Sequence, residues 1–343
     1  MQTPKERGFF FPAEWHKHDS TWLSYPHNEA SFPDKIHTIF PSYNLFIHEL
    51  AKGERVNINV PNEKMKLRVE NELAKLNTNM SNICFHFFET NDAWCRDHGP
   101  AFLINGKGER IVVDWEYNAW GGKYPADKDN LIPEKIASYL DLELVKAGIV
   151  MEGGSVDFNG KGSLITTTSC LLNKNRNPHL NQQQIETKLC DYYGVENIIW
   201  LEAGIDGDDT DGHIDDMVRF VREDSIIAAV ESNRRDANYE PLQRNLKLLK
   251  QCRLQDGKQP TIIELPMPSA VVWQDQRLPA SYANFYISNN AVIVPTYRCS
   301  PDNKAVYILE ECFKDRQVLG IDSTEIIWGL GSFHCLSQQE PSA

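Results

Sequence analysis

Cys335 and His213 are the two side chains whose types and settings in this sequence suit covalent catalysis. Cys335 follows the stretch Gly329-Leu330-Gly331, where the backbone can turn sharply and present a side chain. A free thiol is only slightly ionised at neutral pH, so a nucleophilic cysteine needs a base or a positive charge nearby. His213 follows a glycine and stands between two acidic residues, which places it to act as that base. The pair predicts nucleophilic chemistry at a thiol.

Other cysteines and histidines compete for both roles, because the chain has eight of the former and ten of the latter. A cysteine without a special setting is usually a small buried apolar side chain. His334, next to Cys335, is the obvious rival to His213. Neighbouring residues on a strand face opposite sides, so His334 is expected to point away from the thiol. The cysteines are scattered, with no Cys-x-x-Cys and no histidines at zinc spacing, so no structural metal site is expected.

Three carboxylates are candidates for binding a cationic substrate. Asp97 and Asp215 lie among Gly, Trp and Pro residues rather than on an amphipathic helix, and Glu152 directly follows the apolar segment 148–151. Buried carboxylates need partners, and a cationic ligand can be one. A planar guanidinium group offers paired N–H donors to two carboxylates. These residues therefore favour a small cationic guanidine as the substrate.

Composition and charge narrow the class of protein. The 343 residues are 41% hydrophobic and 24% charged, which is typical of a globular protein. Lys and Arg number 35 against 48 Asp and Glu, a net charge of −13, so no nucleic-acid partner is expected. No apolar stretch approaches the roughly 20 residues of a membrane-spanning helix, and the first residues do not resemble a secretion signal. We therefore expect a cytoplasmic protein without a membrane partner.

The elements that position these residues form a repeated ββαβ pattern. Apolar runs around Asn-Gly or other polar turns predict hairpins, each followed by a helix and a short apolar strand. The N-terminal region supplies a fifth unit, with helices at 34–52 and 62–77, strands at 55–60 and 83–88, and completion by strands near 21–25 and at the C-terminal end. The other four units have hairpins at 101–115, 155–168, 217–230 and 282–297, helices at 128–140, 181–193, 237–251 and 303–315, and closing strands at 145–150, 197–201, 261–265 and 324–328.

Repeats of one unit usually stack as a solenoid or close into a ring, and five units with a long-range closure favour a ring. The alternative is an ordinary mixed α/β sheet. We expect one domain over 1–343. The unusual polar residues follow the closing strands at matching points of successive units. In a ring such points converge on the axis, so these residues are predicted to meet in one central pocket.

Six longer segments stand out in the sequence: NDAWCRDHGP (91–100), NAWGGKY (118–124), EGGS (152–155), CLLNKNRNP (170–178), DTDGHID (209–215) and HCLSQQ (334–339). Through these segments the sequence resembles the agmatine deiminases of the guanidino-group-modifying superfamily, close to the bacterial peptidyl-arginine-deiminase-like proteins. The resemblance extends almost from end to end. It implies an α/β fold, a five-bladed α/β propeller of ββαβ repeats around a central active-site pocket.

The resemblance also implies roles. Cys335 corresponds to the nucleophile, His213 to the acid and base, and Glu152 to the carboxylate that supports this histidine. Asp97 and Asp215 take the guanidinium-binding positions. The implied reaction converts agmatine to N-carbamoylputrescine and ammonia through a covalent thiouronium, with no metal or organic cofactor. Two further positions are less specific: Trp94 is expected beside the substrate or in the core, and Asp209 against the distal amine.

Several alternatives stay open. A deiminase of arginine or peptidyl arginine would use the same chemistry, and a related amidinotransferase would pass the amidino group to an amine. A non-catalytic guanidine-binding or scaffold protein is the alternative from another class. A Cys-His peptidase is disfavoured, because neither Cys-Gly-Ser-Cys-Trp nor Gln-Ala-Cys-x-Gly occurs. The sequence leaves open whether copies of the chain form a homo-oligomer.

Overall fold

The computed structural model describes residues 2–343, which form a mixed α/β fold with several small sheets. Four of the sheets share one plan. A hairpin of two antiparallel strands is followed by a helix, and the third strand then pairs in parallel with the second. The four units are β4 (Ala101–Ile104), β5 (Arg110–Glu116), α5 (Ile132–Tyr139) and β6 (Leu144–Val150); β7 (Val156–Phe158), β8 (Ser163–Thr167), α7 (Gln182–Tyr193) and β9 (Asn197–Leu201); β10 (Val218–Arg222), β11 (Ser225–Val230), α8 (Tyr239–Leu249) and β12 (Thr261–Pro266); and β15 (Tyr286–Ile287), β16 (Ala291–Thr296), α9 (Asp302–Cys312) and β17 (Gln317–Asp322).

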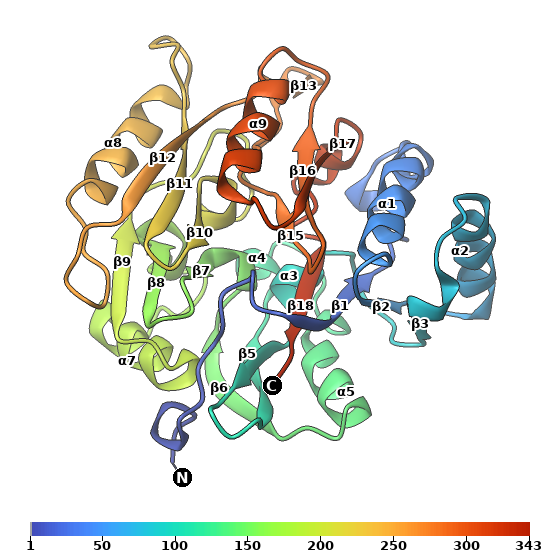
Figure 1. Ribbon diagram of the computed structural model, residues 1–343, viewed down its shortest axis with the longest axis horizontal. Coiled ribbons are helices and arrows are strands. Elements are labelled where there is room, and N and C mark those ends of the chain that lie inside the picture. The colour runs from blue at the N-terminus through green and yellow to red at the C-terminus, as the bar shows by residue number, and fades with distance from the viewer. Residues whose placement is uncertain (1) are drawn as a thin grey trace.

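A fifth sheet joins the two ends of the chain. Its order is β18-β1-β2-β3, in which β1 pairs antiparallel with the C-terminal strand β18 and parallel with β2. Figure 1 shows this pairing as the red strand beside the dark blue one. The predicted completion of the fifth unit by the C-terminal end is thereby confirmed. Its elements are β1 (His18–Ser24), α1 (Ile36–Leu50), β2 (Arg55–Asn59), α2 (Glu63–Lys75), β3 (Ile83–His86) and β18 (Ser337–Pro341).

Apolar spacing explains why the helices pack on their sheets. Along α8, Leu242, Leu246 and Leu249 are buried at intervals of four and three residues, which lie on one helix face. They pack in one core cluster with Ile226 and Ala228 of β11. The helices therefore lie at the outside of the molecule in Figure 1, while the short helix α3 (Cys95–His98) lies near its middle.

The predicted strand at 324–328 was wrong. The closing strand of that unit is β17, which pairs with β16 from Gln317 to Asp322. The Asp322 side chain then accepts hydrogen bonds from the backbone N–H and the hydroxyl of Thr324, a turn that ends the strand. The apolar residues Ile326 and Ile327 are buried in a 3-10 helix, Ile326–Gly329. An apolar run alone does not distinguish these two conformations.

Among residues 2–343, no helix is long and apolar enough to cross a membrane. The arrangement of the five sheets as the blades of a propeller stays a prediction. The remaining short elements are helices α4 (Ala119–Gly122) and α6 (Thr168–Leu171), the hairpin of β13 (Val272–Trp273) and β14 (Gln276–Arg277), and 3-10 helices at Lys5–Arg7, Glu29–Ser31, Met80–Asn82, Asp129–Leu131, Gly153–Ser155 and Ile214–Asp216.

Candidate active site

Five predicted site residues come from four separate connections and are brought together in the interior. Asp97 lies on α3, Glu152 follows β6, and Cys335 lies in the turn before β18. His213 and Asp215 lie at the start of the 3-10 helix Ile214–Asp216. At most 5% of any of the five residues is exposed. Residues that are far apart in sequence therefore share one buried location.

Cys335 lies directly against a carboxylate and an amide. Its Sγ is 3.4 Å from Asp215 Oδ2 and accepts a hydrogen bond from Asn284 Nδ2 at 3.0 Å. Burial, followed by the negative charges of Asp215 and Asp216, raises the pKa of the Cys335 thiol well above its usual range, although the Asn284 amide opposes this. The thiol is therefore protonated at neutral pH until a positive charge enters the site.

His213 is placed as a neutral base. Its Nδ1 lies 3.7 Å from Asp97 Oδ1, and its Nε2 lies 4.0 Å from Glu152 Oε2. Neither ring nitrogen has a hydrogen-bond partner among the described residues. Burial lowers the pKa of His213 to about 3, although the nearby Asp215 opposes this. A neutral imidazole can accept a proton. Its two unpaired, buried nitrogens can also form hydrogen bonds with a ligand or a water molecule.

Asp97 and Asp215 are equally buried carboxylates with opposite shifts. Burial, together with the charges of Asp215 and Glu152, raises the pKa of Asp97 well above its usual range. Burial acts in the same direction on Asp215. The hydrogen bond and the charge of His334 overcome it, and the pKa of Asp215 is lowered. Two adjacent carboxylates with separated pKa values are typical of a functional site.

Glu152 lies behind His213 and is held by Arg176. The Arg176 Nε donates to Glu152 Oε1 at 2.6 Å, and its Nη1 donates to Asp211 Oδ2 at 2.6 Å. Burial raises the pKa of Glu152, and the Arg176 guanidinium opposes the rise. The remaining oxygen, Oε2, faces the His213 ring. The carboxylate is therefore oriented to stabilise a positive charge on this histidine.

Gly154 is the point at which these groups meet. Its N–H donates to Asp97 Oδ1 at 2.9 Å. A Cβ atom at this position would lie 2.7 Å from His213 Nδ1, 2.8 Å from Asp97 Oδ1 and 3.1 Å from Asp215 Oδ2. Only a residue without a side chain allows three functional groups to approach one backbone atom this closely.

A cavity of about 210 Å³ leads to Cys335. Asp97, Trp94 and Asp209 also line it. His213, Asp215 and Glu152 are not among the lining residues, but Asp215 lies directly against the Cys335 thiol that does line it. Trp94 is 4% exposed and packs in the core. One side of its ring system also faces the cavity. Asp209 lies at a more exposed position and already pairs with the Tyr124 hydroxyl at 2.7 Å and with Lys123 Nζ at 3.3 Å. A distal amine would have to compete with these partners.

Comparisons with known proteins identify the family of this chain. Residues 10–341 match the Porphyromonas-type peptidyl-arginine deiminase family. The chain belongs to that family. A similar protein is the agmatine deiminase of Ectopseudomonas mendocina, 34% identical over 99% of this chain and 97% of the relative. Among solved structures, the agmatine deiminase of Enterococcus faecalis is 30% identical, with a TM-score of 0.94 over 100% of this chain and 98% of that one. A cysteine-to-serine variant of the C. jejuni agmatine deiminase, solved with substrate bound, is 34% identical, with a TM-score of 0.88 over 97% and 96% of the two chains.

Within this member of the peptidyl-arginine deiminase family, sequence reasoning missed three residues of the site. Asn284 lies just before β15 and is 1% exposed, and its side-chain amide donates a hydrogen bond to Cys335 Sγ. Arg176 lies inside the segment CLLNKNRNP (170–178), but no role was predicted for it. The reasoning that set His334 apart was wrong, because His334 and Cys335 lie in a turn rather than on a strand. His334 does not line the cavity, but its Nδ1 lies 2.6 Å from Asp215 Oδ2.

Two groups of side chains in the site could hold a metal ion by the type and spacing of their atoms. One consists of Glu152, Cys170 and His213, and the other of Asp215, Asp216 and Cys335, each with ligand atoms within 4.8 Å of one another. Four of these six residues are ones to which the guanidine chemistry assigns roles.

Proposed function

We propose that this chain hydrolyses agmatine to N-carbamoylputrescine and ammonia. One observation carries the proposal: the Cys335 thiol lies at the end of a cavity, 3.4 Å from Asp215, with Asp97 also in the wall. Such a site provides a nucleophile for the central carbon of a guanidinium and carboxylates for its N–H groups. The agmatine deiminases among the similar proteins support the same activity.

The proposed reaction begins when the guanidinium binds between Asp97 and Asp215. Its positive charge offsets the carboxylates that keep the thiol protonated, and neutral His213 takes the proton as Cys335 Sγ bonds to the central carbon. His213 then returns this proton to the departing nitrogen. The carbon–nitrogen bond breaks, ammonia leaves, and a covalent thiouronium remains on Cys335.

In the second half of the reaction, His213 takes a proton from a water molecule. The resulting hydroxide adds to the central carbon, and the carbon–sulfur bond breaks as the carbonyl forms. The leaving thiolate takes the proton of the new hydroxyl group, and His213 releases its proton to ammonia or solvent, which restores the neutral imidazole. The product carries a ureido group. Glu152, held by Arg176, stabilises the imidazolium form of His213 in both halves. No cofactor takes part in the proposed reaction.

The cavity lining favours agmatine over arginine. Its walls include the carboxylates Asp92, Asp97 and Asp209, and the described residues that line it include no Lys or Arg. The α-carboxylate of arginine would meet like charge, and Lys123, the cation beside Asp209, already pairs with that carboxylate. Aromatic side chains suit the methylene chain and the distal cation of agmatine. These are Trp94, Trp120, Tyr124, Trp273 and Trp328.

Ammonia release by the purified protein tests the proposal. Agmatine, arginine and a blocked arginyl peptide are compared in parallel with Cys335→Ala. Release confined to agmatine and lost in the variant is the expected result. Release from another guanidine would keep the mechanism and overturn the substrate. Release that requires an added amine would favour an amidinotransferase, and no thiol-dependent release from any guanidine would refute the activity.

We also infer that the five sheets form the blades of one catalytic propeller domain. The repeated strand order and the pairing of β18 with β1 support this arrangement. A cytoplasmic location fits a small metabolic substrate and a chain with eight free cysteines. Chromatography with light scattering would decide the oligomeric state.

A further inference from the structure

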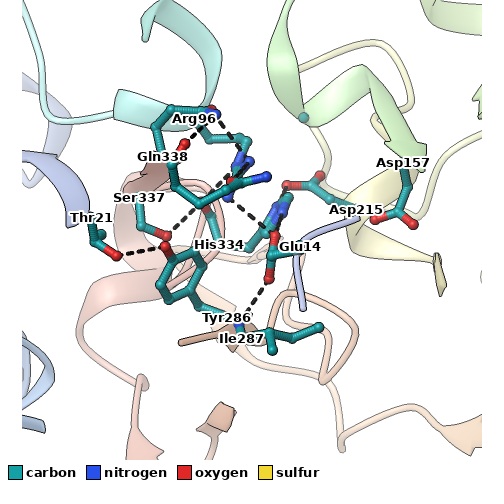
Figure 2. Close-up of polar contacts among 12 residues, drawn as sticks. Glu14, Thr21, Arg96, Asp157, Asp215, Tyr286, Ile287, His334, Ser337 and Gln338 are labelled. Carbon is teal, nitrogen blue, oxygen red and sulfur yellow. Dashed lines mark hydrogen bonds and ion pairs between the residues drawn. The ribbon is translucent and has the colours of Figure 1, made fainter. Parts of the chain in front are cut away.

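Behind the candidate active site, His334 lies between two carboxylates. Its Nδ1 is 2.6 Å from Asp215 Oδ2, and its Nε2 is 2.8 Å from Glu14 Oε2. Figure 2 shows the ring between the two acids, with Asp215 on one side and Glu14 on the other. At most 6% of any of the three residues is exposed, so water does not separate them.

The two contacts define the charge of His334. A neutral imidazole has only one N–H, whereas two ionised carboxylates can only accept. Burial opposes ionisation of Glu14, but Arg219, His334 and Arg96 together hold its pKa well below the usual range. With Asp215 ionised as well, both contacts are hydrogen bonds only if both ring nitrogens carry protons. Two contacts of hydrogen-bond length, on opposite ring nitrogens and each to a carboxylate, therefore favour the imidazolium form of His334.

The surroundings balance this charge. Glu14 Oε2 also lies 2.9 Å from Arg219 Nη2 and 3.3 Å from Arg96 Nη2. Arg219 Nε in turn donates to Asp157 Oδ2 at 2.6 Å. Three cations therefore face three carboxylates, and loss of the His334 charge would leave the buried cluster with an excess negative charge next to Asp215. The titratable and charged groups around the Asp215–His334 pair are Glu14, Arg96, Asp97, Asp157, His213, Asp216, Arg219 and Cys335.

The cluster also determines which oxygen of Asp215 is available. Oδ2 is occupied by His334 and lies near Asn284 and the thiol, while Oδ1 has no hydrogen-bond partner among the described residues. A buried carboxylate oxygen without a partner indicates a missing ligand. The imidazolium thus fixes the rotation of the Asp215 carboxylate. In this rotation, Oδ1 is left to bind the substrate.

We propose that His334 is a positioning residue whose imidazolium, held from behind by Glu14, keeps Asp215 ionised and oriented toward the substrate guanidinium. This inference rests on the proposed function, because it requires a cationic guanidine as substrate. It assigns a role to Glu14, which lies in the N-terminal segment before β1 and far in sequence from the predicted site residues.

Two substitutions separate the charge of His334 from its hydrogen bond. The Asn side chain ends near the position of Nδ1, so His334→Asn keeps a neutral donor for Asp215. The Gln side chain reaches the position of Nε2, so His334→Gln keeps only the donor for Glu14. Both variants remove the positive charge. They are compared for kcat, KM and melting temperature on agmatine, and for agmatine binding in the Cys335→Ser background, from pH 5.5 to about 9.5.

Both variants are expected to move the acidic limb of kcat/KM to higher pH, because Asp215 loses its cation and protonates more readily. Each unit of that shift costs about tenfold at the acidic end. At high pH, His334→Asn should recover to within a few fold of the wild type, while His334→Gln should retain at least tenfold weaker agmatine binding.

Three results would overturn the inference. They are a loss that is equal at every pH and follows the melting temperature, variants indistinguishable from the wild type, and His334→Gln equal to His334→Asn at high pH. Should one variant fail to fold, the pH profile of the other decides. An inactive wild-type protein would instead refute the proposed function. If the wild type acts on another guanidine, the same comparison is made on that compound.

Discussion

Gly154→Ala tests whether the catalytic groups depend on close approach to one backbone atom. The added methyl group would lie 2.7 Å from His213 Nδ1 and 2.8 Å from Asp97 Oδ1, whereas ordinary contacts begin at 3.4 Å. The imidazole or the carboxylate must therefore move by about half an ångström or more. Misplacement of a catalytic group by about 1 Å can cost roughly a hundredfold in rate.

We expect the kcat of Gly154→Ala on agmatine to fall about thirtyfold to a hundredfold, or about 2–3 kcal/mol in activation free energy. The structural cost is limited, because the clashing atoms are the ends of side chains, which can rotate where backbone cannot. Overpacking of this kind costs about 1–3 kcal/mol of unfolding free energy in a buried site. Gly154 has an ordinary backbone conformation, so the methyl group itself adds no backbone strain.

Continuous ammonia detection gives kcat and KM, and urea denaturation gives the unfolding free energy. Gly106→Ala is the matched control, because Gly106 also has an ordinary backbone conformation and an added Cβ there meets nothing within 4 Å. This control should be as active as the wild type. A Gly154→Ala protein with kcat within threefold of the wild type would refute the reasoning.

Three further predictions concern burial and charge. Because burial and nearby charges raise the pKa of the Cys335 thiol, its rate of alkylation by iodoacetamide in the free protein should still rise above pH 9. Peptide mass spectrometry measures this rate, and a rate that reaches a plateau below pH 8 would contradict the prediction. Arg176→Met leaves Glu152 buried without its cation and should lower the unfolding free energy by about 3–5 kcal/mol in urea, with Arg176→Lys losing less. His213, with a pKa lowered from 6.5 to about 3, stays neutral in the folded protein while the unfolded chain gains a proton, so stability falls as the pH drops below 6.5. His213→Gln should therefore lose roughly 2 kcal/mol less than the wild type between pH 6.5 and 4.5, and equal losses would show that this histidine does not titrate as described.

The periodic part of the fold could be predicted from the sequence. The hairpins, helices and parallel strands of the repeats follow from alternation and turn residues, which act locally. The error at 324–328 arose where two apolar isoleucines, Ile326 and Ile327, are buried by a 3-10 helix instead of a strand. Burial requires apolar residues in either conformation, so the pattern alone could not decide.

The site was predictable only where a residue type is unusual for its setting. Cys335 and His213 stood out because glycines and acids surround them in the chain. Asn284 carries no such signal, since a single Asn before a strand is common in turns. Its contact with the thiol exists only because β15 and the turn before β18 meet in space. Local sequence could not reveal a partnership that tertiary packing creates.

Helix α3 explains how consecutive polar residues can all be buried. Its four residues point in different directions, so each finds a different partner. The backbone N–H of Arg96 donates to Cys335 O at 3.0 Å, and its side chain reaches Glu14. Asp97 turns toward Gly154 and the cavity. One short turn therefore holds the backbone of Cys335, the proposed nucleophile, the acid behind His334 and a carboxylate of the cavity. A substitution of the Arg96 side chain should thus act through Glu14 on His334 and Asp215, while its backbone bond to Cys335 persists. A substitution of Asp97 should act on the cavity and also on His213 and Gly154, which it contacts.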